Sequence, residues 1–149
     1  INKSNYIGWM HGDLQQPINV LDKLFPIIDS SKYNVIKGIR KNRGFVSMFF
    51  TIGMSFVMTL LFLKLHKDVA GQPNIISKKY FHLIDSAPND FAFDFYIYNK
   101  ILMKNESFYR FKTIFLPRKF GESSWDKGIS SKIKHSIRTL KYLLTLRFF

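Results

Sequence analysis

The fold is decided by the stretch Tyr6–Arg40, which reads YIGWMHGDLQQPINVLDKLFPIIDSSKYNVIKGIR. Its opening residues, Tyr6–Met10, predict a short strand that ends in a turn. Apolar residues then recur at helical spacing, and Pro17 stands where a first helical turn tolerates proline, so residues 17–28 are predicted to form a helix. Tyr33–Arg40 predicts a second strand, broken at its glycine. A strand, a helix and a strand in close succession indicate an α/β fold.

The segment Phe45–Leu63 contains no charged residue and is long enough to span a membrane. It also carries a hydroxyl residue at every fourth position, which on a helix makes one polar stripe. These residues are Ser47, Thr51, Ser55 and Thr59. The pattern favours a helix that lies in the membrane interface or packs against partner helices. A true membrane span and an ordinary core helix are the alternatives.

The rest of the chain continues the α/β pattern. Asn74–Ser77 predicts a short strand, and Ser86–Met103 predicts an aromatic-rich helix capped by Asn89 or Asp90. Tyr109–Pro117 alternates and predicts another strand.

A basic amphipathic helix is predicted from Ile129 onward. Its apolar positions share one helix face and are set against lysine and arginine: Ile133, Ile137, Leu140, Leu144 and Phe148. Helices of this kind lie on anionic bilayers.

The charge balance points to anionic partners. Lysine and arginine number 23 against 10 acidic residues, which gives a net charge of +13. Nucleic acid, phosphorylated small molecules and acidic lipid headgroups are the candidate partners. The absence of cysteine excludes disulfides, thiolate metal sites and cysteine nucleophiles. The motifs of P-loop nucleotide triphosphatases, zincin proteases and serine hydrolases are also absent.

A candidate cation site follows the first predicted strand. Asp13 and Gln15 are two residues apart, so their side chains can converge on one cation. Oxygen ligands of this kind suit Mg²⁺ or Mn²⁺, completed by phosphate oxygens and water. His11 is a further candidate ligand, although a neutral turn histidine is the simpler interpretation.

A candidate phosphate site follows the second predicted strand. Arg40 and Arg43 lie three residues apart, beside Gly38 and Gly44. Guanidinium groups bind phosphate through paired hydrogen bonds, and glycine lets the backbone approach an anion closely.

Two further acids are candidates for chemistry. Asp90 and Asp94 are four residues apart and are expected to stack on one helix face. Either could act as a general base or orient an arginine. A helix cap for Asp90 and an ion pair for Asp94 are the structural alternatives.

Five blocks of the sequence, in their order and separation, resemble family-two glycosyltransferases with the GT-A fold. The closest likeness is to the polyprenyl-phosphate-sugar-synthase-like branch, which includes dolichol-phosphate mannose synthase. The blocks are Gly12–Pro17, Val35–Arg43, Lys67–Phe81, Pro88–Tyr98 and Phe120–Trp125.

The resemblance implies the C-terminal part of a GT-A, Rossmann-like nucleotide-sugar transferase domain. This part would cover residues 1–125, with an apolar interface helix at 45–65 and a basic amphipathic helix at 126–149. The family's first strands, which hold the nucleotide base and ribose, precede the segment that begins at Ile1. The chain alone is therefore expected to have little or no transferase activity.

The resemblance also implies site residues. Asp13 would be the second carboxylate of the D-x-D metal motif, helped by Gln15, while His11 replaces the first aspartate. Arg40 and Arg43 would hold the acceptor's phosphate.

Two other parts of the family's site have counterparts here. Asp94 falls near an acidic position where some relatives keep a base. Gly121 and Ser123 resemble the loop over the site.

The resulting expectation is an inverting, metal-dependent glycosyltransferase, peripheral at the cytoplasmic face of the membrane. It would move a sugar from a nucleotide-diphosphate donor to a lipid-phosphate or polysaccharide acceptor, bind an anionic membrane surface, and could form a homo-oligomer. One rival is a basic nucleic-acid-binding module. The aromatic residues sit mostly in apolar runs rather than among the cations, so no nucleic-acid partner is expected. The other rival is a small integral membrane protein spanning with Phe45–Leu63.

Overall fold

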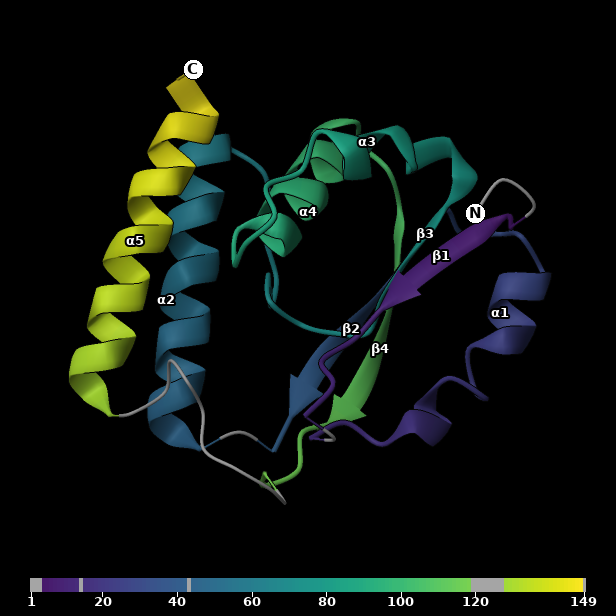
Figure 1. Cartoon of the computed structure of the whole chain (residues 1–149), viewed down its shortest axis with the longest axis horizontal. Helices are drawn as coiled ribbons and strands as arrows, with labels where there is room; N and C mark the ends of the chain where they lie inside the picture. The colour runs from purple at the N-terminus through teal and green to yellow at the C-terminus, as the bar shows by residue number, and fades with distance from the viewer. Residues whose placement is uncertain (1–3, 14, 43, 119–127, 149) are drawn as a thin grey trace.

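The structure is a computed structural model that describes residues 4–13, 15–42, 44–118 and 128–148. Within these residues, four strands form one mixed sheet in the order β1-β3-β2-β4. They are β1 (Tyr6–Trp9), β2 (Val35–Lys41), β3 (Asn74–Ser77) and β4 (Phe108–Ile114). β3 is antiparallel to both neighbours, and β2 is parallel to β4. The carboxyl ends of β1, β2 and β4 therefore meet at one end of the sheet (Figure 1).

Five α-helices and two 3₁₀ turns accompany the sheet in the described part of the chain. The helices are α1 (Phe25–Asp29), α2 (Phe45–Phe62), α3 (His82–Asp85), α4 (Phe93–Met103) and α5 (Ile129–Phe148), and the 3₁₀ turns are η1 (Ile18–Val20) and η2 (Lys78–Tyr80). The predicted α/β class is confirmed. α2 and α5 lie side by side and run in the same direction, on the opposite side of the molecule from α1 (Figure 1).

The predicted helix over residues 17–28 is wrong. The chain instead makes the short turn η1 and then begins α1 at Phe25. Pro26 lies in the first turn of α1, where its missing N–H has no helical partner to lose. In a continuous helix the same proline would remove a hydrogen bond and clash with the preceding turn, so the helix restarts there.

The predicted break at Gly38 is also wrong, because β2 runs through it without interruption. The glycine is needed for packing against the chain that leads into β3. A Cβ atom at position 38 would lie 2.1 Å from the carbonyl oxygen of Gln72. The close approach that this glycine permits is therefore to residue 72.

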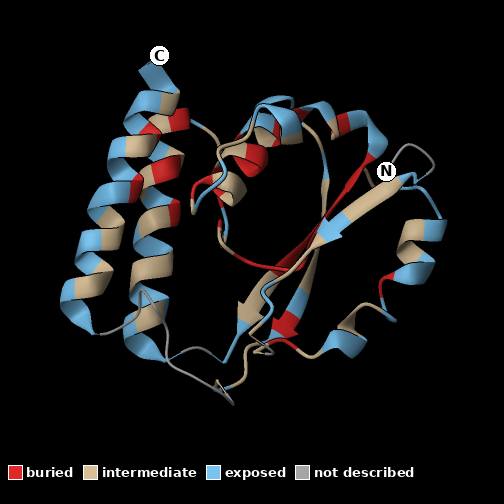
Figure 2. Cartoon of the chain, in the orientation of Figure 1, coloured by how far each residue is buried: buried red, intermediate tan, exposed pale blue. Residues whose placement is uncertain are grey.

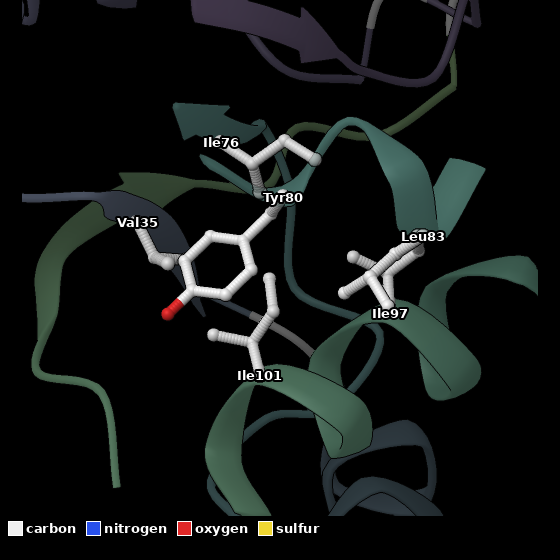
Figure 3. Close-up of a cluster of buried hydrophobic side chains, with 6 residues drawn as sticks. All are labelled: Val35, Ile76, Tyr80, Leu83, Ile97 and Ile101. Carbon is white, nitrogen blue, oxygen red and sulfur yellow. The ribbon is translucent and has the colours of Figure 1, made fainter. Parts of the chain in front are cut away.

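The main core lies between one face of the sheet and α3 and α4. Figure 3 shows the six buried side chains that form it: Val35, Ile76, Tyr80, Leu83, Ile97 and Ile101. Leu24, Ile36 and Ile75 form a smaller cluster that brings in the α1 region. Val35 and Ile36 point to opposite faces, as alternation along a strand requires. The sheet is thus covered on both faces.

A third cluster joins α2 and α5 to the domain. Its buried members are Met58, Phe62, Val69, Phe95, Tyr98 and Leu143. Leu143 and Thr139 are the buried residues of α5, so this helix packs on the domain through one narrow side.

The orientation of α2 is the reverse of that of an ordinary surface helix. Its hydroxyl stripe is half-buried or buried, while large apolar side chains point outward. Phe49 and Phe56 are 67% and 61% exposed, and only Ser55, Met58 and Phe62 are buried. Figure 2 shows that most of the outer surface of α2 and α5 is not buried. The core-helix alternative is therefore wrong. Of the described helices, α2 alone is long and apolar enough to cross a membrane.

The remaining expectations hold with shifted boundaries. Asn74–Ser77 is confirmed as a strand, and the strand predicted at Tyr109–Pro117 spans Phe108–Ile114. The helix predicted within Ser86–Met103 begins only at Phe93, after the separate short helix α3.

One border of the sheet is open in the described structure. β1 pairs only with β3, so its other edge has no strand beside it. An apolar groove of about 410 Å³ lies between β1 and the α1 region. Its lining includes Tyr6, Ile7, Leu21, Phe25, Ile28 and Ile75.

Candidate functional site

The candidate site lies at the end of the sheet where β1, β2 and β4 finish. Two backbone hydrogen bonds tie the segment after β4 to the segments after the other two strands. The Leu116 N–H donates to the Gln15 carbonyl at 2.7 Å, and the Phe115 N–H donates to the Lys41 carbonyl at 3.1 Å. Residues from three separate parts of the chain therefore meet at this end.

Asp13 and Gln15 converge as the spacing predicts. Both side-chain oxygens face one nitrogen, Nη2 of Arg118, at 3.0 Å from Asp13 Oδ2 and 3.4 Å from Gln15 Oε1. The Gln15 N–H donates to Asp13 Oδ1 at 3.2 Å, and the Gln15 amide donates to the Leu116 carbonyl at 3.1 Å. The turn thus aims one carboxylate oxygen and one amide oxygen at a single point.

This arrangement fits a divalent cation as a two-ligand site. Mg²⁺ is commonly held by one or two protein oxygens and completed by phosphate and water. Among the described residues, no group of three or more histidine, cysteine or acidic side chains could hold a metal by itself. His11 is exposed and belongs to no such group.

Arg40 is held by Asp68, a partner that the sequence analysis did not identify. The Arg40 Nε donates to Asp68 Oδ1 at 3.0 Å, and Nη2 pairs with the same oxygen. The two side chains are only 8% and 9% exposed. Burial alone would raise the pKa of the Asp68 carboxyl, but the hydrogen bonds and charge of Arg40 outweigh it and hold that pKa below its usual value. Much of the Arg40 hydrogen-bonding capacity is therefore used inside the protein.

Arg40 also forms one wall of a pocket of about 90 Å³ between α2 and α5. The pocket is amphiphilic. Its polar lining is Ser47, Thr51, Lys132, His135, Ser136 and Thr139, and its apolar lining includes Phe50, Met54, Val69 and Phe95. Burial, and then the charge of Arg138, lower the pKa of His135. A neutral histidine and two cations thus line an otherwise uncharged hollow.

Of the other predicted members of the phosphate site, the structure describes Gly38 but not Arg43. Gly38 lies inside β2 and abuts Gln72, as described above. Arg43, together with the loop residues Gly121 and Ser123, lies outside the described residues.

Asp94 receives three hydrogen bonds from neutral donors. Trp9 Nε1 donates at 2.6 Å, Gln72 Nε2 at 2.7 Å and Asn74 Nδ2 at 3.1 Å. The expected ion pair is therefore replaced by a network that joins α4 to β1 and β3. A carboxylate with this many donors is a strong structural anchor.

Asp90 does not share a helix face with Asp94, because it precedes the start of α4. Its carboxylate accepts the Ala92 N–H at 2.9 Å and pairs with Arg138 of α5 at 3.0 Å. Asp90 thus caps the turn before α4 and links it to α5.

Lys37 is a buried lysine whose role was not predicted from the sequence. Lys37 Nζ donates to the carbonyls of Val69 and Gly71 and to Asn74 Oδ1, each at 2.9 Å. Burial lowers the pKa of Lys37 to about 8, against the opposing effect of Asp94 and Asp68. Its one sequence signal was a charge set between the apolar residues at the start of the strand Val35–Lys41.

No protein-family model matches the sequence, and the search of curated proteins finds no match.

Proposed function

We propose that this chain provides the cation-binding and acceptor-binding parts of a metal-dependent glycosyltransferase. The reaction would move a sugar from a nucleotide-diphosphate donor to a lipid-phosphate acceptor. In this reaction the bond from the sugar's anomeric carbon to the diphosphate breaks, and an acceptor phosphate oxygen forms a new bond to that carbon. The chain would then be part of a nucleotide-sugar transferase domain of the GT-A type.

The observation that carries the proposal is the convergence of Asp13 and Gln15 on one cationic atom. Carboxyl ends of parallel strands are common ligand sites in open α/β sheets. A divalent cation bound there would neutralise the charge that develops on the departing diphosphate. The chain's own contribution is to hold the two oxygens in place. The Leu116 N–H donates to the Gln15 carbonyl, the Gln15 side-chain amide donates to the Leu116 carbonyl, and the Gln15 N–H donates to Asp13 Oδ1.

The pocket between α2 and α5 suits an acceptor with an anionic head and an apolar chain. Lys132 supplies positive charge in the pocket, and Arg40, which is paired with Asp68, forms part of its wall. The pocket lies on the amino-terminal halves of both helices, toward the positive ends of their dipoles. Phe50, Met54 and Phe95 supply apolar contact.

Asp94 is not required as a base in this scheme. A phosphate acceptor is already an anion at neutral pH, so no proton has to be removed from it. The three donors around Asp94 instead support an anchoring role.

The outward faces of α2 and α5 support a peripheral location on an anionic membrane. Exposed apolar side chains follow one another at helical spacing along each helix: Phe45, Phe49, Ile52, Phe56, Leu60 and Leu63 on or next to α2, and Ile129, Ile133, Ile137, Leu140, Leu144 and Phe148 on α5. Exposed cations flank the apolar face of α5, among them Lys134, Arg138 and Lys141. Apolar insertion combined with basic side chains is the usual way for an amphipathic helix to bind acidic lipids. A nucleic-acid surface would instead interleave its aromatic residues with cations.

Binding of farnesyl phosphate, a short prenyl phosphate, tests the acceptor site. Lys132→Glu is expected to weaken binding about tenfold, because it places a negative charge beside the anionic head. Lys134→Glu makes the same charge change at an exposed position of α5 that does not line the pocket, and should change the affinity little. Equal effects of the two substitutions, or equal binding of farnesol, would contradict the acceptor proposal.

A further inference from the structure

We infer that Arg118 is an internal counter-ion of the cation site, so that its guanidinium and a divalent cation occupy Asp13 and Gln15 alternately. The inference rests on the proposed cation site and adds a competition within this chain. It assigns to Arg118 a role in setting the affinity of that site.

The contacts of Arg118 account for this role. Its Nη2 atom approaches Asp13 Oδ2 and Gln15 Oε1, the same two oxygens that face the candidate cation position. The other Asp13 oxygen, Oδ1, already accepts the Gln15 N–H. The Gln15 amide nitrogen is committed to the Leu116 carbonyl, which fixes the direction of its oxygen. Arg118 therefore covers the two oxygens that the turn leaves available.

Simultaneous occupancy is disfavoured by both space and charge. Mg²⁺ requires its oxygen ligands at about 2.0–2.1 Å, which is closer than either oxygen is to Nη2. A cation at that distance from both oxygens would lie in the space of the guanidinium and would repel its charge. The Arg118 side chain must move away when the cation binds.

The exposure of the pair makes such an exchange feasible. The side chains of Arg118 and Asp13 are 28% and 19% exposed, so water reaches both. Ion pairs with this much solvent contact are weak enough for a ligand to displace. The backbone contact between Leu116 and Gln15 involves no side chain of Arg118, so the turn keeps its shape when the guanidinium leaves.

Direct Mn²⁺ binding, measured by electron paramagnetic resonance on the full chain, tests this competition. Arg118→Gln is expected to tighten Mn²⁺ binding about fivefold, because the cation no longer displaces an ion pair. Lys112→Gln removes the same charge from an exposed position on β4 and should change the affinity less than twofold, by screening. Asp13→Asn should abolish binding at this site. Circular dichroism verifies that each variant is folded.

The outcomes separate the competition from the site itself. If Asp13→Asn abolishes Mn²⁺ binding but Arg118→Gln binds no more tightly than Lys112→Gln, the competition is refuted and the cation site remains. If neither the unmodified chain nor Arg118→Gln binds Mn²⁺, the cation site and the competition are both refuted.

A second measurement follows the arginine directly. The Nε–Hε signal of Arg118 in a ¹⁵N NMR spectrum, assigned by its loss in Arg118→Gln, should shift on addition of Mg²⁺. The shift should disappear in Asp13→Asn. A signal that stays unchanged while Mg²⁺ binds would refute the competition, because a purely structural Arg118 would not respond to the cation.

Discussion

The Asp68 carboxylate binds Arg40 twice, at its side chain and at its backbone. Besides the guanidinium contacts, the Arg40 N–H donates to Asp68 Oδ2 at 2.7 Å. The pair therefore joins the end of β2 to the chain that leads into β3, and it fixes Arg40 as a wall of the pocket between α2 and α5.

Replacement of Asp68 should destabilise the fold strongly. Asp68→Asn leaves a nearly buried guanidinium without its counter-charge, and the free energy of unfolding should fall by about 3 kcal/mol in urea denaturation. Asp22→Asn, at an exposed position, should change it by less than about 0.5 kcal/mol. Because the Asp68 pKa is lowered in the folded state, its stabilisation is present above the ordinary carboxyl pKa and is lost as the pH falls through the folded value. The difference between the unmodified chain and Asp68→Asn should therefore narrow in acid.

Asp94 should prove to be an anchor of the fold. Asp94→Asn would turn an NH₂ group toward donors that need an acceptor, so the free energy of unfolding should fall by about 2 kcal/mol. Asp85→Asn, an exposed substitution of the same kind, is the matched control. Urea denaturation checks both, and a variant as stable as the unmodified chain would contradict the anchoring role.

The lowered pKa of Lys37 predicts that the free energy of unfolding rises in alkaline solution. Its pKa is about 8 in the folded chain and near 10.5 when unfolded, so the folded state loses its proton first. Between these values the unfolded state binds more protons, and stability rises with pH. Relative to Lys37→Met, the unmodified chain should gain up to about 3 kcal/mol from pH 8 to pH 10.5. Lys41→Met, at an exposed position on the same strand, is the control. The difference in unfolding free energy between the unmodified chain and Lys41→Met should not change with pH. A flat profile for Lys37→Met too would show that the lysine keeps its ordinary pKa.

The outer face of α2 should be required for membrane binding. The double substitution Phe49→Asp/Phe56→Asp should reduce co-flotation with phosphatidylglycerol vesicles about 100-fold or more, because two exposed aromatic side chains no longer enter the lipid. Phe25→Asp is the matched control, since Phe25 is 55% exposed on α1, away from α2.

Two further measurements on the same protein separate the alternatives for α2. Release by carbonate extraction is expected for a peripheral helix, whereas retention in the membrane pellet would indicate a span. Sedimentation analysis shows whether a second copy covers the apolar face instead. A stable dimer that does not float with vesicles would overturn the membrane proposal.

The sequence predicted the helices and strands that depend on a local pattern of residues. The uncharged run with its hydroxyl stripe correctly indicated α2, helical spacing indicated α5, and alternation indicated β4. Prediction from the sequence failed where contacts with distant parts of the chain determine the role of a residue. Gly38 serves contact with Gln72, and Asp94 binds donors from β1 and from the segment around β3. The partner of Arg40 is 28 residues away, and the partner of Asp13 is 105 residues away. The split helix at Pro26 is different, because the proline itself is a local signal.

The open border of β1 has a consequence for how this polypeptide combines with others. The backbone groups on the outer edge of β1 can form hydrogen bonds with a strand of a second polypeptide. The groove beside α1 can bind the apolar side chains of such a strand. Growth of the sheet on that side would leave the opposite flank, with α2 and α5, uncovered. A strand added there and the proposed lipid surface at α2 and α5 would therefore not compete for the same part of the protein.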